Sequence, residues 1–73
     1  MKVKELKKIL EEYFDLVFVV IDKPDFNKYF IQFMVNHKLP SINYKWDNHF
    51  DKESNVSSLC NQIKAKILEA FIR

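Results

Sequence analysis

Two histidines and one cysteine are the side chains here best suited to metal binding or nucleophilic chemistry. His37 and His49 are twelve positions apart, and Cys60 follows eleven positions later. Zinc sites usually use closely spaced pairs such as Cys-x-x-Cys or His-x-x-x-His, and neither pair occurs. The spacing therefore predicts no metal site, and His37, in a turn beside Lys38, is expected to be an ordinary surface histidine.

The remaining polar groups that could do chemistry have simpler structural roles. Cys60 falls on the apolar stripe of a predicted helix, where a small buried hydrophobe is expected. A nucleophilic cysteine would need a base and an electropositive, partly exposed site. Asp47 and Asp51 flank His49, but a calcium loop would need more oxygen ligands and a glycine. We therefore predict no catalytic residue, no metal, no cofactor and no enzymatic activity.

Length and composition limit the class of protein. The 73 residues are predicted to form one domain, residues 1–73, near the lower size limit for independent folding. One cysteine allows no internal disulfide, which favours a cytoplasmic protein. The longest apolar run has six residues, far below the roughly 20 that span a bilayer, so no membrane association is expected. The absence of glycine disfavours phosphate-binding loops.

The amino-acid composition indicates a coding bias. Lysine greatly outnumbers arginine, Asn, Ile, Phe and Tyr are frequent, and threonine is absent. This pattern is typical of AT-rich genomes, such as those of low-GC bacteria and their phages or plasmids. The net charge of +2 is too small to indicate nucleic-acid binding by itself.

Hydrophobic periodicity predicts two helices. Apolar residues at three- and four-residue spacing indicate an amphipathic helix over about residues 3–13. A second helix is expected to begin after a cap at Ser54 or Asn55. Its apolar stripe consists of Val56, Leu59, Cys60, Ile63, Ile67 and Ala70.

Three strands are predicted between the helices. They cover residues 16–22, 28–36 and 41–46, and the turns at 23–27 and 37–40 contain Pro, Asp and Asn. Phe50 in the following polar loop is expected to fold onto the core, and Trp46 to lie at its rim. We thus predict an α+β domain of order α-β-β-β-α, with a three-stranded antiparallel sheet and both helices packed on one face.

This order of elements is similar to that of the double-stranded RNA-binding domain, HicA-type ribonuclease toxins and the Alu-domain subunits of the signal recognition particle. The resemblance covers the whole chain but rests on topology alone. The RNA-binding domain grips phosphate through lysines that begin its last helix, whereas positions 54–58 here read Ser-Asn-Val-Ser-Ser. The toxins carry a histidine beside a glycine, which this chain lacks. The particle subunits use basic residues on the open sheet face, where Lys45 is expected here.

The first strand is apolar at every position from 16 to 21, so both of its faces are hydrophobic. If the helices cover one face, the other presents Phe30, Met34 and one alternate set of the first strand. That set is either Val17, Val19 and Ile21 or Leu16, Phe18 and Val20. This patch would be absent if the helices lay on opposite faces of the sheet. It would also be absent if Phe26 and the C-terminal residues folded over the sheet.

We therefore expect a small non-enzymatic interaction protein, acting as a homodimer or by docking on a protein partner through this face and the uncharged edge of the first strand. An accessory or inhibitor protein of a phage or plasmid fits the composition. The predicted interface consists of Val17, Val19, Ile21, Phe30, Met34, Phe71 and Ile72. The alternative is a nucleic-acid-binding domain that uses Lys2, Lys4, Lys7, Lys8, Lys38 and Lys45.

Overall fold

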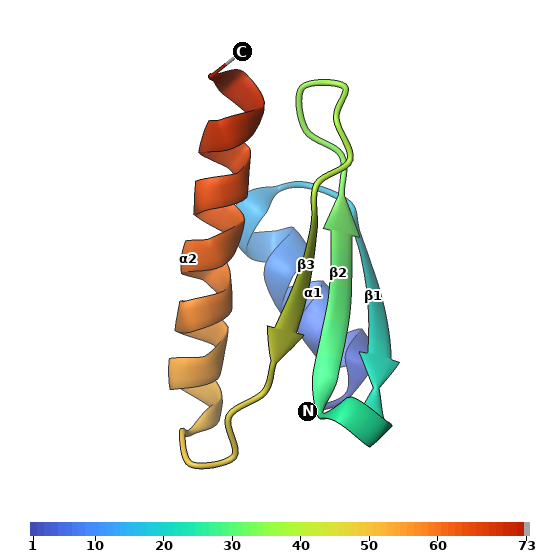
Figure 1. Cartoon of the computed structure of the whole chain (residues 1–73), viewed down its shortest axis with the longest axis vertical. Helices are drawn as coiled ribbons and strands as arrows, with labels where there is room; N and C mark the ends of the chain where they lie inside the picture. The colour runs from blue at the N-terminus through green and yellow to red at the C-terminus, as the bar shows by residue number, and fades with distance from the viewer. Residues whose placement is uncertain (73) are drawn as a thin grey trace.

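The computed structural model describes residues 1–72 of the chain and contains two helices and a three-stranded antiparallel sheet. The order α-β-β-β-α confirms the predicted α+β fold. Figure 1 shows the strands as a meander, with α1 behind the sheet and α2 on the side of β3. The elements are α1 (Val3–Phe14), β1 (Phe18–Lys23), the 3-10 turn η1 (Pro24–Phe26), β2 (Lys28–Phe33), β3 (Ser41–Lys45) and α2 (Lys52–Phe71).

Two short turns fix the register of the sheet. In the first, Pro24 begins η1 and Asn27 takes a left-handed conformation, so that Lys23 pairs with Lys28. In the second, Asn36 and His37 both have positive φ between the bridged residues at 35 and 38. Two central residues with positive φ are typical of the type I′ hairpin turn. The strands are therefore held in one alignment by local turn geometry.

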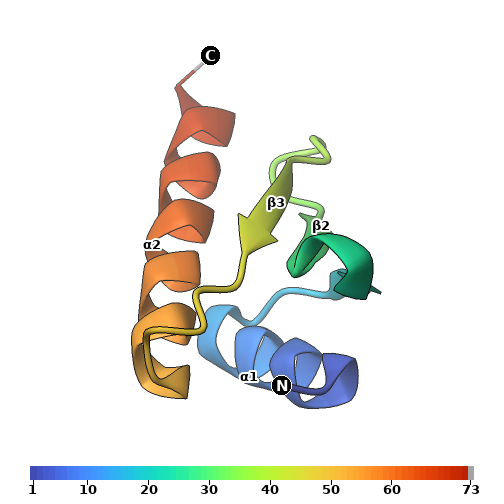
Figure 2. The same cartoon turned by 60° about the horizontal axis from the view of Figure 1, so that its bottom comes forward.

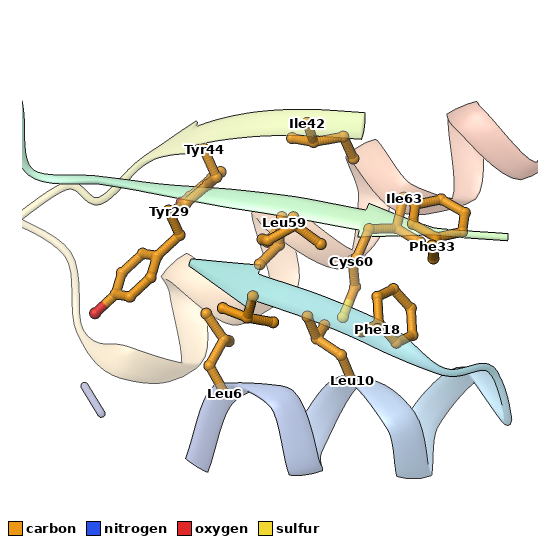
Figure 3. Close-up of a cluster of buried hydrophobic side chains, with 12 residues drawn as sticks. Leu6, Leu10, Phe18, Tyr29, Phe33, Ile42, Tyr44, Leu59, Cys60 and Ile63 are labelled. Atoms are coloured by element: carbon orange, nitrogen blue, oxygen red, sulfur yellow. The ribbon is translucent and has the colours of Figure 1, made fainter. Parts of the chain in front are cut away.

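Both helices bury their apolar sides against the same face of the sheet. Leu6 and Leu10 reach this face from α1, and Leu59 and Ile63 reach it from α2. Figure 2 shows the sheet lying to one side of the two helices, and Figure 3 shows their side chains meeting those of the strands. The buried cluster consists of Leu6, Leu10, Phe18, Val20, Tyr29, Ile31, Phe33, Ile42, Tyr44, Leu59, Cys60 and Ile63.

The start of α2 differs from the sequence-based prediction. The helix begins at Lys52, and the side chain of Asp51 caps it by accepting a hydrogen bond from the Ser54 N–H at 2.7 Å. An aspartate suits this position because its oxygen caps a free N–H and its negative charge interacts favourably with the positive end of the helix dipole. The predicted cap at Ser54 or Asn55 is therefore wrong by one turn. Phe50 is 56% exposed, so the expectation that it folds onto the core is also wrong.

Asn55 is instead a buried residue that ties α2 to the sheet. Its Oδ1 accepts hydrogen bonds from the Tyr44 hydroxyl and the Asp47 N–H, both at 2.9 Å. Its Nδ2 donates to the carbonyl oxygens of Asp47 at 2.9 Å and Asp51 at 3.0 Å. The side chain is fully buried, so these bonds replace all of its contacts with water. One amide thus joins β3, the loop after it and the first turn of α2.

Replacing Asn55 by alanine should lower the free energy of unfolding by about 1–3 kcal/mol, because buried groups lose their partners. Urea denaturation followed by circular dichroism measures this change. Asn61→Ala is the matched control, since Asn61 is exposed on the same helix and its loss should change stability little. Equal stability of the two variants would contradict the role of Asn55.

Candidate functional site

The sheet face opposite the helices is uncovered, and we call it the open face. The register places nine strand residues on it in three rows across the sheet. Because side chains alternate along a strand, the neighbours of these residues point to the side of the sheet on which the helices pack. The open face consists of Val19, Ile21 and Lys23 in β1, Lys28, Phe30 and Gln32 in β2, and Ser41, Asn43 and Lys45 in β3.

Three of the predicted interface residues, Val19, Ile21 and Phe30, lie on the open face. Val19 is 50% exposed and Ile21 is 48% exposed, while Phe30 between them is half-buried. Val17 and Met34 extend this patch beyond the strand ends and are more exposed still. Phe18 and Val20 are buried, so the structure selects between the two alternate sets of β1 that the sequence left open.

The other two predicted interface residues lie elsewhere. Phe71 and Ile72 are exposed at the C-terminal end of α2, in the helix layer rather than on a strand. Asn36 in the hairpin turn holds this end by donating from Nδ2 to the Ala70 carbonyl at 2.8 Å. That bond satisfies one of the carbonyls that a helix end leaves without a partner. The two residues are thus a separate apolar site.

Three lysines lie side by side at one end of the open face. Lys23 pairs across the strands with Lys28, which in turn pairs with Lys45. We call these residues the lysine row. The Lys23 ammonium lies over the Phe30 ring, 5.4 Å from its centre. Like charges directly opposite each other destabilise a sheet, so the row does not help the fold.

Lys23 and Lys28 are absent from the sites predicted from sequence. The signal was nevertheless present, because a turn at residues 24–27 puts its two flanking residues opposite each other. Placing Lys45 beside them requires the register of β3, which depends on a turn whose left-handed residues are Asn36 and His37. Such a turn is hard to recognise without glycine.

The free edge of β1 is partly protected by α1. The Phe18 N–H points away from β2 and donates to Glu11 Oε2 at 3.0 Å. Lys7 also binds this carboxylate, and these two donors lower the pKa of Glu11. By the alternation of an antiparallel ladder, the backbone groups of Val20 and Asp22 face the same free edge. The edge is therefore capped at its start and open further along.

The lysines predicted for nucleic-acid binding do not form one surface. Lys2 is the N-cap residue of α1, while Lys4, Lys7 and Lys8 lie on α1, where acidic residues of the same helix accompany them. Lys38 lies in the β2–β3 hairpin, at the opposite end of β3 from Lys45. Lys45 alone is on the open face, on the other side of the sheet from α1.

The histidines, the aspartates and the cysteine that were considered for metal binding or catalysis lie in a turn, in a loop and in the core. His37 is exposed in the hairpin turn, and Asp47 accepts a hydrogen bond from the His49 N–H at 2.9 Å. Cys60 is buried, and this burial raises the pKa of its thiol. Within residues 1–72, no group of three or more His, Cys, Asp or Glu side chains is placed to hold a metal ion. The same residues include no helix long and apolar enough to cross a membrane.

Comparison with protein-family models, with curated proteins and with solved structures found no match. The open face itself is therefore the basis for a proposal of function. Its two parts are an apolar patch on β1 and β2 and the lysine row at one end.

Removing the central charge of the lysine row should stabilise the fold. Lys28→Gln removes both cross-strand repulsions, and we expect the free energy of unfolding to rise by about 0.2–1 kcal/mol at low salt. The gain should shrink in about 1 M salt, where charges are screened within roughly 3 Å. Urea denaturation measures the change in the free energy of unfolding, and Lys8→Gln on α1 is the control variant. A destabilised Lys28→Gln at low salt would contradict the repulsion.

Proposed function

We propose that this chain is a small non-enzymatic protein-interaction module, acting as a homodimer or by docking on another protein through its open face and the free edge of β1. The uncovered apolar patch is the observation that carries the proposal. Contiguous exposed patches of several hundred Å² are typical of interaction sites. Covering about 400 Å² of apolar surface gives roughly 10 kcal/mol before the costs of association.

The edge of β1 supports the same function. Exposed strand edges are normally blocked by charges, proline or bulges, or they pair with another chain. Glu11 blocks the edge only at Phe18. The following segment from Val19 to Ile21 is uncharged and uninterrupted, so it can accept an added strand.

A cytoplasmic location and an origin in a phage or plasmid belong to this proposal. A single free cysteine is consistent with a reducing compartment. The amino-acid bias typical of AT-rich genomes and the small size fit accessory or inhibitor proteins of such elements. The cysteine and the composition support a cellular location and a genetic origin, and they do not bear on the binding surface.

A photo-reactive amino acid placed at Gln32 should cross-link to protein in cells that naturally carry this chain. Gln32 lies on the central strand of the open face, beside the apolar patch, so its substitute would touch a partner bound there. The same amino acid at Lys8, on the exposed side of α1, is the control. Mass spectrometry identifies the products. The proposal is wrong if position 32 gives no more cross-linked protein than position 8.

Nucleic-acid binding is the second candidate, and the lysine row is the observation that favours it. Three adjacent lysines beside an aromatic ring could bind a phosphate backbone. They include Lys45 of the predicted set but none of the lysines on α1. The candidate therefore depends on the open face as well.

If nucleic acid is the ligand, affinity for duplex RNA or DNA should fall steeply as salt rises. About three lysine–phosphate contacts would give a slope of log affinity against log salt near −3. Fluorescence anisotropy with labelled duplexes measures it from about 50 mM salt upward. No binding at the lowest salt concentration would exclude this candidate.

A further inference from the structure

The charge on the open face has only one sign. Of its nine strand residues, three are lysines and none is acidic. The ion pairs that the structure shows within residues 1–72, Lys7–Glu11 and Lys52–Glu5, both lie on the helices. The lysine row therefore has no counter-charge on its own face. A partner that supplies carboxylates would remove the repulsion and gain charge-assisted hydrogen bonds.

The strand residues of a second copy of this chain do not provide those carboxylates. Two open faces can meet about a two-fold axis in two ways, because the same surface is used by both copies. An axis along the strands places one lysine row on the other. An axis across the strands places each row over the Val17 and Met34 end of the other copy. Neither end of the face carries an acidic strand residue.

A single-stranded nucleic acid is also a poor match for this surface. Such ligands stack their bases on several exposed aromatic rings. Phe30 is the single aromatic residue among the nine, it is half-buried, and the Lys23 ammonium covers its ring. The exposed apolar groups beside it, Val19 and Ile21, are aliphatic. Aliphatic side chains pack against other aliphatic and aromatic side chains, which a protein provides.

We propose that the open face binds an acidic and apolar segment of a different protein, an inference that rests on the proposed function. Neighbouring strands are about 4.8 Å apart, so the lysine row spans roughly 10 Å. Carboxylates at positions i and i+4 of a helix are about 6 Å apart, which is close to the separation of two neighbouring lysines in the row. A helix lying across the strands would set its acidic side on the row and its apolar side on Ile21 and Phe30.

Carbodiimide cross-linking tests the acidic contact directly, since the reagent joins a lysine amine only to a carboxylate. We would treat cells that naturally carry the full chain and map the linked peptides by mass spectrometry. The expected result is a link from Lys23, Lys28 or Lys45 to an Asp or Glu of another protein, in excess of any link from Lys8. Ile21→Ser should lower the yield roughly tenfold, as for loss of a buried contact. Leu68→Ser, on the exposed side of α2, should leave it unchanged.

Three results would overturn the inference. They are links from the row to a second, isotope-labelled copy of the chain, ultraviolet cross-links from the open face to nucleic acid, and no links above the Lys8 level. Protein capture by the photo-reactive group at position 32 without carboxylate links at the row would refute the acidic partner and leave the interaction module in place. Absence of both would refute the module as well.

Discussion

Both helices, of 12 and 20 residues, pack on the same face of the three-stranded sheet, and this arrangement determines the rest of the surface. Leu6 and Leu10 of α1 and Leu59 and Ile63 of α2 pack against the inner face. No further element exists within residues 1–72 to cover the other face. A small chain with an apolar strand therefore exposes half of that strand to water. The open face follows directly from this shortage of covering structure.

The two faces of the sheet carry residues of different kinds, because one is packed in the core and the other is exposed. The inner face is packed and its buried amide at Asn55 has partners for both oxygen and nitrogen. The open face carries exposed aliphatic groups and three lysines in one row, neither of which stabilises an isolated domain. Features that weaken the isolated fold are expected where a protein meets its ligand. This contrast is the physical reason to assign function to the open face.

Periodicity was sufficient to predict the elements and their order, because each helix and strand has a clear apolar pattern. The cap of α2 was misplaced because Asp51, Ser54 and Asn55 are all good capping residues, and only the fold shows that Asn55 is buried. The inward set of β1 was undecided because both of its faces are apolar. Lys28 was missed because its partners in the row come from two other strands, and the alignment of β3 depends on a turn at Asn36 and His37 that contains no glycine.

The central claim is that the open face is covered by another molecule in the cell. Hydroxyl-radical labelling of Met34 tests it most directly, because this thioether is exposed on the open-face patch and oxidises readily. Phe50, equally exposed but in the loop before α2, serves as the internal reference. We predict that labelling of Met34 relative to Phe50 is much lower in cells that naturally carry the chain than in the dilute purified protein. Equal ratios in the two samples would contradict the claim.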